Sequence, residues 1–321
     1  LQVNPDGTTN NRHNVFVRYP KITETMEWLD PDEDWDKKVF DFAQTTYFLR
    51  IADHLASKGF RRGVDLNGAP YDWRKAPNEL QGFYDGLIPL IQTTFQNNGN
   101  RPVVLVAHST GSLVLLHFLN NNVTQAWKDL HIKAVVSLAA PWRGSVHALR
   151  ADINTPTHYG LWGAKGDCAF VKHSARCLVS SSNCRPMPRT RAGTVKEYGR
   201  LFADMEYQEG LAIWNATRDL FADLTAPGVE IHCLYGTGVD TPAKLIYKGN
   251  KFPDGYPKDE EEDGDGVVSS CSLEASRAWS TRRNSGKAVV HVPLKKVDHL
   301  EILEDKAVLD YIERVAITLE A

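Results

Sequence analysis

The segment 101–119 constrains the possible fold of this chain more than any other stretch. Residues 103–107 form a continuous apolar run rich in β-branched side chains, which predicts a strand buried on both faces. Residues 108–111, His-Ser-Thr-Gly, interrupt that run, and residues 112–119 then carry apolar side chains at helical spacing. The pattern therefore predicts a strand, a sharp turn and a helix, with Ser109 at the bend.

A serine at such a bend is typical of the nucleophile elbow of α/β-hydrolases. The elbow needs small residues two positions before and two positions after the serine, because the strand and helix backbones nearly touch there. Ala107 and Gly111 occupy these positions, so the motif is A-x-S-x-G, one methyl larger than the usual G-x-S-x-G. The alternative is an ordinary helix start with Ser109 as its N-cap. We favour the nucleophile, and we expect an α/β-hydrolase fold with a mostly parallel central sheet flanked by helices.

Composition sets the class of protein. The chain has 321 residues, 42% of them hydrophobic and 24% charged, which is ordinary for a globular protein with a large core. A net charge of −3 gives no reason to expect nucleic-acid binding, and no apolar run approaches the roughly 20 residues of a membrane span. Five cysteines suffice for two disulfides, and Asn122 and Asn215 begin glycosylation sequons. Together these features favour a secretory or lysosomal compartment.

The periodicity along the chain divides it into a core and an insertion. Strands are expected at 14–19, 63–68, 103–107, 132–139, 230–235 and 288–294, and helices at 40–58, 79–96, 112–119 and 306–317, the second kinked or split by Pro89. From Arg143 to Pro227 this alternation stops, and an amphipathic stretch runs from 195 to 224. We therefore expect a hydrolase core in residues 1–142 and 228–321, with residues 143–227 as an inserted cap.

A serine nucleophile needs a histidine base, and the histidine needs a carboxylate to fix its tautomer. In α/β-hydrolases these residues follow in the order serine, acid, histidine. That order leaves His232, His291 and His299, of which the first two lie inside expected strands. His299 follows the last strand in a loop, where a catalytic base belongs, and we choose it over the alternative of a surface histidine.

The acid is expected in residues 262–268, where Asp263 and Asp265 are flanked by glycines that permit a tight turn. We choose Asp265, with Asp263 in reserve. A calcium loop or a solvated acidic loop are the alternatives, although the spacing does not fit an EF-hand.

Six separated motifs carry a family resemblance. They are GAPYDWR at 68–74, VAHSTG at 106–111, LAAPW at 138–142, HCLYGTG at 232–238 (followed by Thr241-Pro242), DGDG at 263–266 and DHL at 298–300. In this order they resemble the lecithin:cholesterol acyltransferase-like family, from about Phe16 to Val315, with the middle of the cap matching least. The resemblance implies acyl chemistry on glycerophospholipids, with a chain passed to water or to a lipid alcohol, at a phospholipid bilayer or lipoprotein surface. It implies no metal and no cofactor.

The resemblance also assigns residues. Ser109 is expected as the nucleophile, Asp265 as the acid and His299 as the base, with the N–H of Thr110 holding the oxyanion. Cys233 looks like a family disulfide cysteine, for which Cys271 is the only candidate partner after the acid loop.

Two further motifs each allow two assignments. Trp142 either lines the acyl pocket, as a substrate-binding residue, or belongs to the core. We interpret Tyr71–Arg74 as an aromatic and a charged pair that lock a loop, in preference to a substrate-binding motif. The chain departs from the family at Thr110 and Ser112, in place of methionine and asparagine, and at Arg143, in place of glycine.

Without the resemblance, the residues support a serine esterase or acyltransferase with a cap. The alternatives are a neutral-lipid or small-ester hydrolase on the same scaffold and a catalytically silent lipid-binding protein. A second oxyanion donor is expected from a glycine-rich loop after an early strand. We find no such loop ahead of Phe40, so we expect upstream sequence to supply it and residues 1–321 alone to be weakly active or insoluble.

Overall fold

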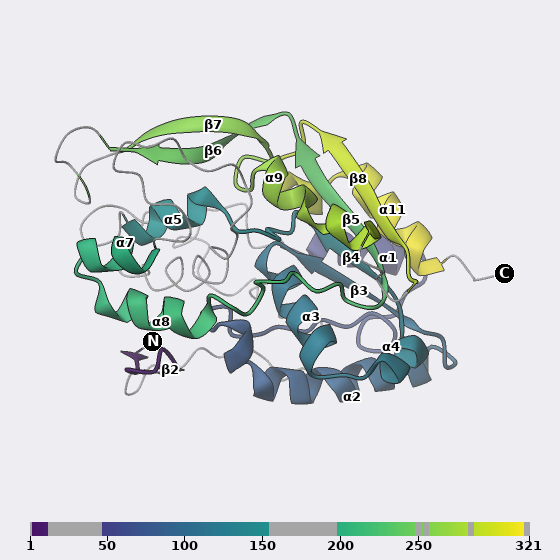
Figure 1. Ribbon diagram of the computed structural model, residues 1–321. Coiled ribbons are helices and arrows are strands. Elements are labelled where there is room, and N and C mark those ends of the chain that lie inside the picture. The colour runs from purple at the N-terminus through teal and green to yellow at the C-terminus, as the bar shows by residue number, and fades with distance from the viewer. Residues whose placement is uncertain are drawn as a thin grey trace, which may run out of the picture.

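A parallel sheet lies at the centre of the computed structural model, which describes residues 2–11, 47–153, 198–247, 252, 257–281 and 286–317. The sheet has the strand order β3 (Val103–His108), β4 (Ile132–Leu138), β5 (Glu230–Thr237) and β8 (Val289–Lys295) (Figure 1). All three strand pairings are parallel. The carboxyl ends of the strands therefore share one edge, and loops that follow different strands meet there.

Helices cover both faces of this sheet, because its central strands are apolar on both sides. On one face lie α2 (Gln81–Asn97) and α3 (Thr110–Asn121), whose buried side chains form a core with residues of β4 and β5. On the other face lie α1 (Leu49–Ser57) and α11 (Lys306–Ile317), which form a second core with the opposite faces of the same strands. This is the layered arrangement of the α/β-hydrolase fold, as the sequence predicts.

Two local predictions are wrong. Of the kink or split expected at Pro89, the split is wrong: α2 is one helix that contains Pro89, because the buried residues Leu87 and Ile91 hold it to the core on both sides of the proline. The expected strand at 63–68 is a turn, because Asp65 accepts hydrogen bonds from the main-chain N–H and the guanidinium of Arg61, at 2.5 and 2.9 Å. The expected strand at 14–19 lies outside the described residues.

A two-stranded antiparallel sheet of β6 (Val239–Ile246) and β7 (Lys258–Gly264) was not expected from the sequence. Strand β7 carries six charged residues, which are depleted in strands, and we interpreted this stretch as a loop. Helix α4 (Gln125–His131) was also missed. The remaining short elements are β1 (Gln2–Val3), β2 (Thr9–Asn10), α9 (Ser270–Leu273), α10 (Ala278–Thr281) and 3₁₀ turns at Pro77–Glu79, Glu274–Arg277 and Glu301–Leu303.

Within residues 143–227, the structure describes α5 (Val146–Ile153), α7 (Tyr198–Asp204) and α8 (Gln208–Thr217). They share a small core around Leu149 and Phe202, against which Leu245 of β6 also packs. In Figure 1 these helices group to one side of the parallel sheet. No helix in the described part of the chain is long and apolar enough to cross a membrane.

Candidate active site

Ser109 lies at the junction of β3 and α3 with φ 51° and ψ −129°. Positive φ is rare for a residue with a side chain and costs on the order of 1–3 kcal/mol, so the surrounding structure must impose it. The main-chain N–H of Ser109 donates to the carbonyl of Leu138 in β4 at 2.8 Å, which fixes the bend to the neighbouring strand. The serine therefore occupies a strained turn at the carboxyl end of β3.

Three side chains from three separate loops form one hydrogen-bond chain. His299 Nε2 lies 3.0 Å from Ser109 Oγ, and His299 Nδ1 lies 2.8 Å from Asp265 Oδ2. A carboxylate can only accept, so Nδ1 carries the proton and Nε2 is left as an acceptor for the serine hydroxyl. Asp265 is 0% exposed and His299 is 6% exposed, so water does not compete for either contact. This is the geometry of a nucleophile, a base and an orienting acid.

The other oxygen of Asp265 is also satisfied. Its Oδ1 accepts hydrogen bonds from the N–H groups of Val267 and Val268, at 3.0 and 2.7 Å. These two bonds hold the carboxylate in the orientation in which Oδ2 reaches His299 Nδ1. The tight turn after Asp265, permitted by Gly266 at φ 89°, brings these N–H groups back onto the side chain.

Asp263 occupies a different position. Its Oδ1 accepts from the N–H of Gly238 at 2.5 Å, and its Oδ2 accepts from the hydroxyl of Ser270. The residue is exposed and ties the start of β6 to the start of α9. The structure thus brings Asp265 to His299 and gives Asp263 a bracing contact.

The two other candidate histidines do not join this chain of hydrogen bonds. His232 in β5 bonds to Glu230 and to the hydroxyl of Tyr311, both at 2.8 Å. His291 in β8 packs its ring against that of Tyr235, 6.1 Å between centroids. Both lie inside strands, as expected.

Thr110 is the first residue of α3, where the main-chain N–H has no acceptor within the helix. The positive end of the helix dipole lies at the same place, so an anion formed beside Ser109 is stabilised there. Ser112, which replaces the asparagine typical of the family, is buried, and its hydroxyl donates to the carbonyl of Ala107 at 3.3 Å.

The beginning of the 143–227 region is fastened to the loop that carries Asp265. The main-chain N–H of Arg143 donates to Ser272 Oγ at 2.9 Å, and the hydroxyl of Ser145 donates to the carbonyl of Val267. The side chain of Arg143 is half-buried. The acid loop is therefore braced from the side of the expected cap.

Trp142 and the 71–74 motif both have structural contacts. Trp142 is 3% exposed and packs edge-on against Trp279, with 4.9 Å between ring centroids. This burial favours the core alternative over the pocket-lining one. Asp72 and Arg74 form a buried ion pair, 2.7 Å between Oδ2 and a guanidinium nitrogen, while Trp73 points outward and is 36% exposed.

The expected disulfide between Cys233 and Cys271 is wrong. Cys233 is a free thiol, 2% exposed on β5, whose sulfur accepts from the hydroxyl of Ser276 at 3.4 Å. Cys271 is disulfide-bonded and lies on the exposed side of α9. The thiol of Cys233 is therefore not the partner of Cys271.

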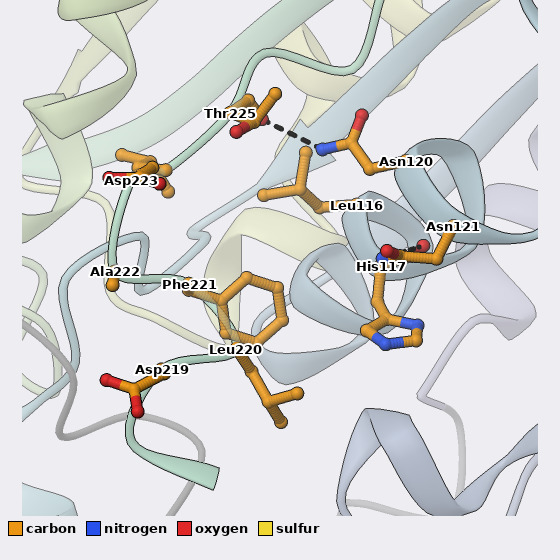
Figure 2. Close-up of a pocket in the computed structure, with 11 residues that line it drawn as sticks. Leu116, His117, Asn120, Asn121, Asp219, Leu220, Phe221, Ala222, Asp223 and Thr225 are labelled. Carbon is orange, nitrogen blue, oxygen red and sulfur yellow. Dashed lines mark hydrogen bonds between the residues drawn. The ribbon is translucent and has the colours of Figure 1, made fainter.

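A cavity of about 240 Å³ lies at the far end of α3 (Figure 2). It is lined by the last two turns of that helix and by residues 219–225. Asn120 donates to the carbonyl of Thr225 at 3.0 Å, and Asn121 donates to that of His117 at 2.9 Å, so these polar groups are satisfied. At 1.5 Å per residue, Asn120 lies about 16 Å along the helix from Ser109, so this cavity is separate from the hydrogen-bond chain.

One group of potential metal ligands occurs among the described residues, formed by His54, Asp310 and Glu313 between α1 and α11. Glu313 bonds to His54 at 2.8 Å and to Lys58 at 2.9 Å, and Asp310 pairs with Lys306. These contacts form an ion-pair network that joins two helices.

Sequence comparisons give the chain's relatives. The family profile for lecithin:cholesterol acyltransferase matches residues 2–157 and 207–306. "Lysosomal phospholipase A and acyltransferase" is 36% identical in Rattus norvegicus and 35% identical in Homo sapiens, in each case over 97% of this chain and 73% of the relative. "Phosphatidylcholine-sterol acyltransferase" of Mus musculus is 32% identical over 96% of this chain and 70% of the relative.

Proposed function

Because this chain belongs to the lecithin:cholesterol acyltransferase family, we propose that it is a serine-dependent phospholipase A and O-acyltransferase. The hydrogen-bond chain from Ser109 through His299 to the buried Asp265 carries this proposal. Relatives named for phospholipase and acyltransferase activity supply the substrate class.

In the first half-reaction, Ser109 Oγ attacks the carbonyl carbon of a fatty acyl ester while its proton moves to His299 Nε2. The tetrahedral oxyanion forms beside the N–H of Thr110 and is stabilised by it. The intermediate collapses with cleavage of the ester C–O bond, and the lyso-lipid oxygen leaves with the proton from His299. An acyl-serine remains.

In the second half-reaction, water or a lipid alcohol gives its proton to His299 and attacks the acyl carbon. Collapse breaks the bond to Ser109 Oγ, which recovers the proton from His299. The product is a fatty acid or an acylated alcohol. Asp265 stays ionised throughout and stabilises the imidazolium at each step.

The same proposal includes a location and a surface. The substrate is held in a bilayer or lipoprotein, so the enzyme acts peripherally at a lipid surface. A lysosomal or secreted location is supported by the names of the relatives, by the sequons at Asn122 and Asn215 and by the disulfide at Cys271.

Phosphatidylcholine liposomes, with and without an added lipid alcohol, test this function. We expect lyso-lipid and fatty acid without the alcohol, and an acylated alcohol in its presence. Ser109→Ala should abolish both products and labelling by a fluorophosphonate probe, since loss of a triad serine costs on the order of a millionfold in kcat. Cleavage of neutral-lipid or short-chain esters alone would favour the neutral-lipid or small-ester hydrolase. Binding of the folded protein to the liposomes without any turnover or labelling would favour a lipid-binding protein.

A further inference from the structure

His108 is the residue before Ser109 on β3, and the mechanism above gives it no role. It is 4% exposed. Its Nε2 lies 2.8 Å from the main-chain carbonyl oxygen of His299, and its ring packs against the ring of His299, with 4.9 Å between centroids. The strand that presents the nucleophile is therefore bonded directly to the loop that presents the base.

The partners of His108 determine which of its nitrogens carries the proton. The carbonyl oxygen of His299 can only accept, so Nε2 must be the donor. The other nitrogen, Nδ1, is bonded to the hydroxyl of Tyr47, in the turn before α1. Burial lowers the pKa of His108 to about 3, and the electrostatic interaction with the adjacent His299 acts in the same direction, so the ring is neutral and Nδ1 accepts from Tyr47.

All four polar groups of His299, two on its side chain and two on its main chain, have a hydrogen-bond partner. Its side chain bonds to Asp265 through Nδ1 and to Ser109 through Nε2. Its main-chain N–H donates to the main-chain carbonyl of Asp265 at 2.9 Å. The fourth group, the main-chain carbonyl, is held by His108 alone among the contacts of the described residues.

We propose that His108 is a positioning residue for the reaction, which holds the backbone of His299 through its Nε2–H while Tyr47 fixes the tautomer that makes this donation. The inference rests on the proposed roles of Ser109 and His299. Without this bond the peptide of His299 can rotate, and Nε2 moves away from Ser109 Oγ. A misplacement of about 1 Å in a catalytic group costs on the order of 100-fold in rate.

His108→Met and His108→Gln test the role. Met fills the space without an N–H, whereas the Gln amide places a donor where Nε2 was. We expect His108→Met to lose about 100-fold in kcat on phosphatidylcholine with little change in KM, and a similar factor in the rate of fluorophosphonate labelling. His108→Gln should recover most of both rates. His232→Met is the matched control, because His232 is also buried and doubly bonded, and its folded fraction should keep the wild-type kcat.

Nitrogen-15 spectra of the wild-type protein report the tautomers directly, and we expect the proton on Nε2 of His108 and on Nδ1 of His299. A wild-type kcat in folded His108→Met, or a proton on Nδ1 of His108, would overturn the inference. If His108→Met does not fold, His108→Asn replaces it, since its shorter amide cannot reach the carbonyl and should be slower than His108→Gln. Labelling of Ser109 follows the positioning effect even if phospholipid is not the substrate, so failure of the two proposals can be told apart.

Discussion

Asp265 and His299 are joined at two points. The side chains meet at 2.8 Å between Oδ2 and Nδ1, and the main chains meet at 2.9 Å between the carbonyl of Asp265 and the N–H of His299. The acid loop and the base loop are therefore fastened to each other as one unit. Within this unit the side-chain bond sets the tautomer of His299, and the main-chain bond sets its position.

Asp265→Asn should reduce kcat far more than Asp263→Asn. Both changes remove one negative charge at or just after the end of β7, but of these two residues only Asp265 bonds to His299. An amide at that position selects the wrong tautomer, a change worth about ten-thousandfold in a well-studied serine protease triad. Asp263→Asn should cost about 1 kcal/mol of stability through its contacts with Gly238 and Ser270. Steady-state kinetics and thermal unfolding of both variants check this, and equal losses of kcat would show that Asp265 does not orient His299.

Gly236 lies where β5 passes beneath this unit. A Cβ on Gly236 would lie 1.9 Å from the carbonyl oxygen of Val297 and 3.0 Å from Cβ of Asp265. Gly236→Ala should therefore cost about 3 kcal/mol of stability, at the upper end of overpacking effects, and should lower kcat by displacing both loops. Thermal unfolding and turnover of the folded fraction are the measurements.

Gly82→Ala is the control, because a Cβ there has nothing within 4 Å and the residue lies exposed in α2. It should stabilise the protein by about 0.5–1 kcal/mol and leave turnover unchanged. A stable and active Gly236→Ala would mean that the close approach to Val297 is not maintained in solution.

The core of the fold could be predicted from the sequence because each of its main elements has a hydrophobic pattern within its own residues. The buried runs of β3, β4 and β5 and the amphipathic pattern of α11 are readable from hydrophobic periodicity. The hairpin of β6 and β7 was missed because its strands carry a proline and many charged side chains, which are depleted in strands. The helix α2 is not split at Pro89, because tertiary packing on both sides of the proline outweighs the loss of one hydrogen bond.

The candidate triad was predictable for a different reason. In this fold the serine, the acid and the histidine follow in a fixed order, and the histidine lies in the loop after the last strand. These two rules select His299 from the eleven histidines of the sequence. In the structure His299 Nε2 lies within hydrogen-bond distance of Ser109 Oγ. The role we propose for His108 was not accessible, because its bond to the His299 carbonyl spans 191 residues and leaves no spacing pattern. The cysteine pairing failed because spacing does not say which face of an element a thiol occupies.

The buried pair of Asp72 and Arg74 should make stability depend on acidity. Burial raises the pKa of Asp72, but the hydrogen bonds and charge of Arg74 outweigh burial and lower it below its ordinary value. A carboxyl with a lowered folded-state pKa contributes stability above its unfolded pKa of about 3.9 and loses it as pH falls through the folded pKa. Asp72→Asn should cost about 3–5 kcal/mol at neutral pH by leaving Arg74 unpaired.

Denaturant unfolding of wild type and Asp72→Asn between neutral pH and about pH 3 checks this dependence. The difference in the free energy of unfolding between the two proteins should shrink as pH falls below about 4. In that range wild type loses the stability contributed by the ionised Asp72 carboxylate, which the variant lacks at every pH. Asp53→Asn, at an exposed pair with Arg62, is the control and should cost less than about 1 kcal/mol. Parallel curves for Asp72→Asn and wild type would contradict the assignment of this acid sensitivity to Asp72.

The free thiol of Cys233 gives the last prediction. Its burial raises its pKa and excludes reagents, so iodoacetamide should not modify it in the native protein. In denaturant without reductant, Cys233 should be alkylated and Cys271 should not. In Cys271→Ser the thiol released belongs to another cysteine, so labelling of Cys233 should be unchanged. Peptide mass spectrometry measures the alkylation of each cysteine. A peptide linking Cys233 to Cys271 in a non-reduced digest would show that Cys233 is not a free thiol.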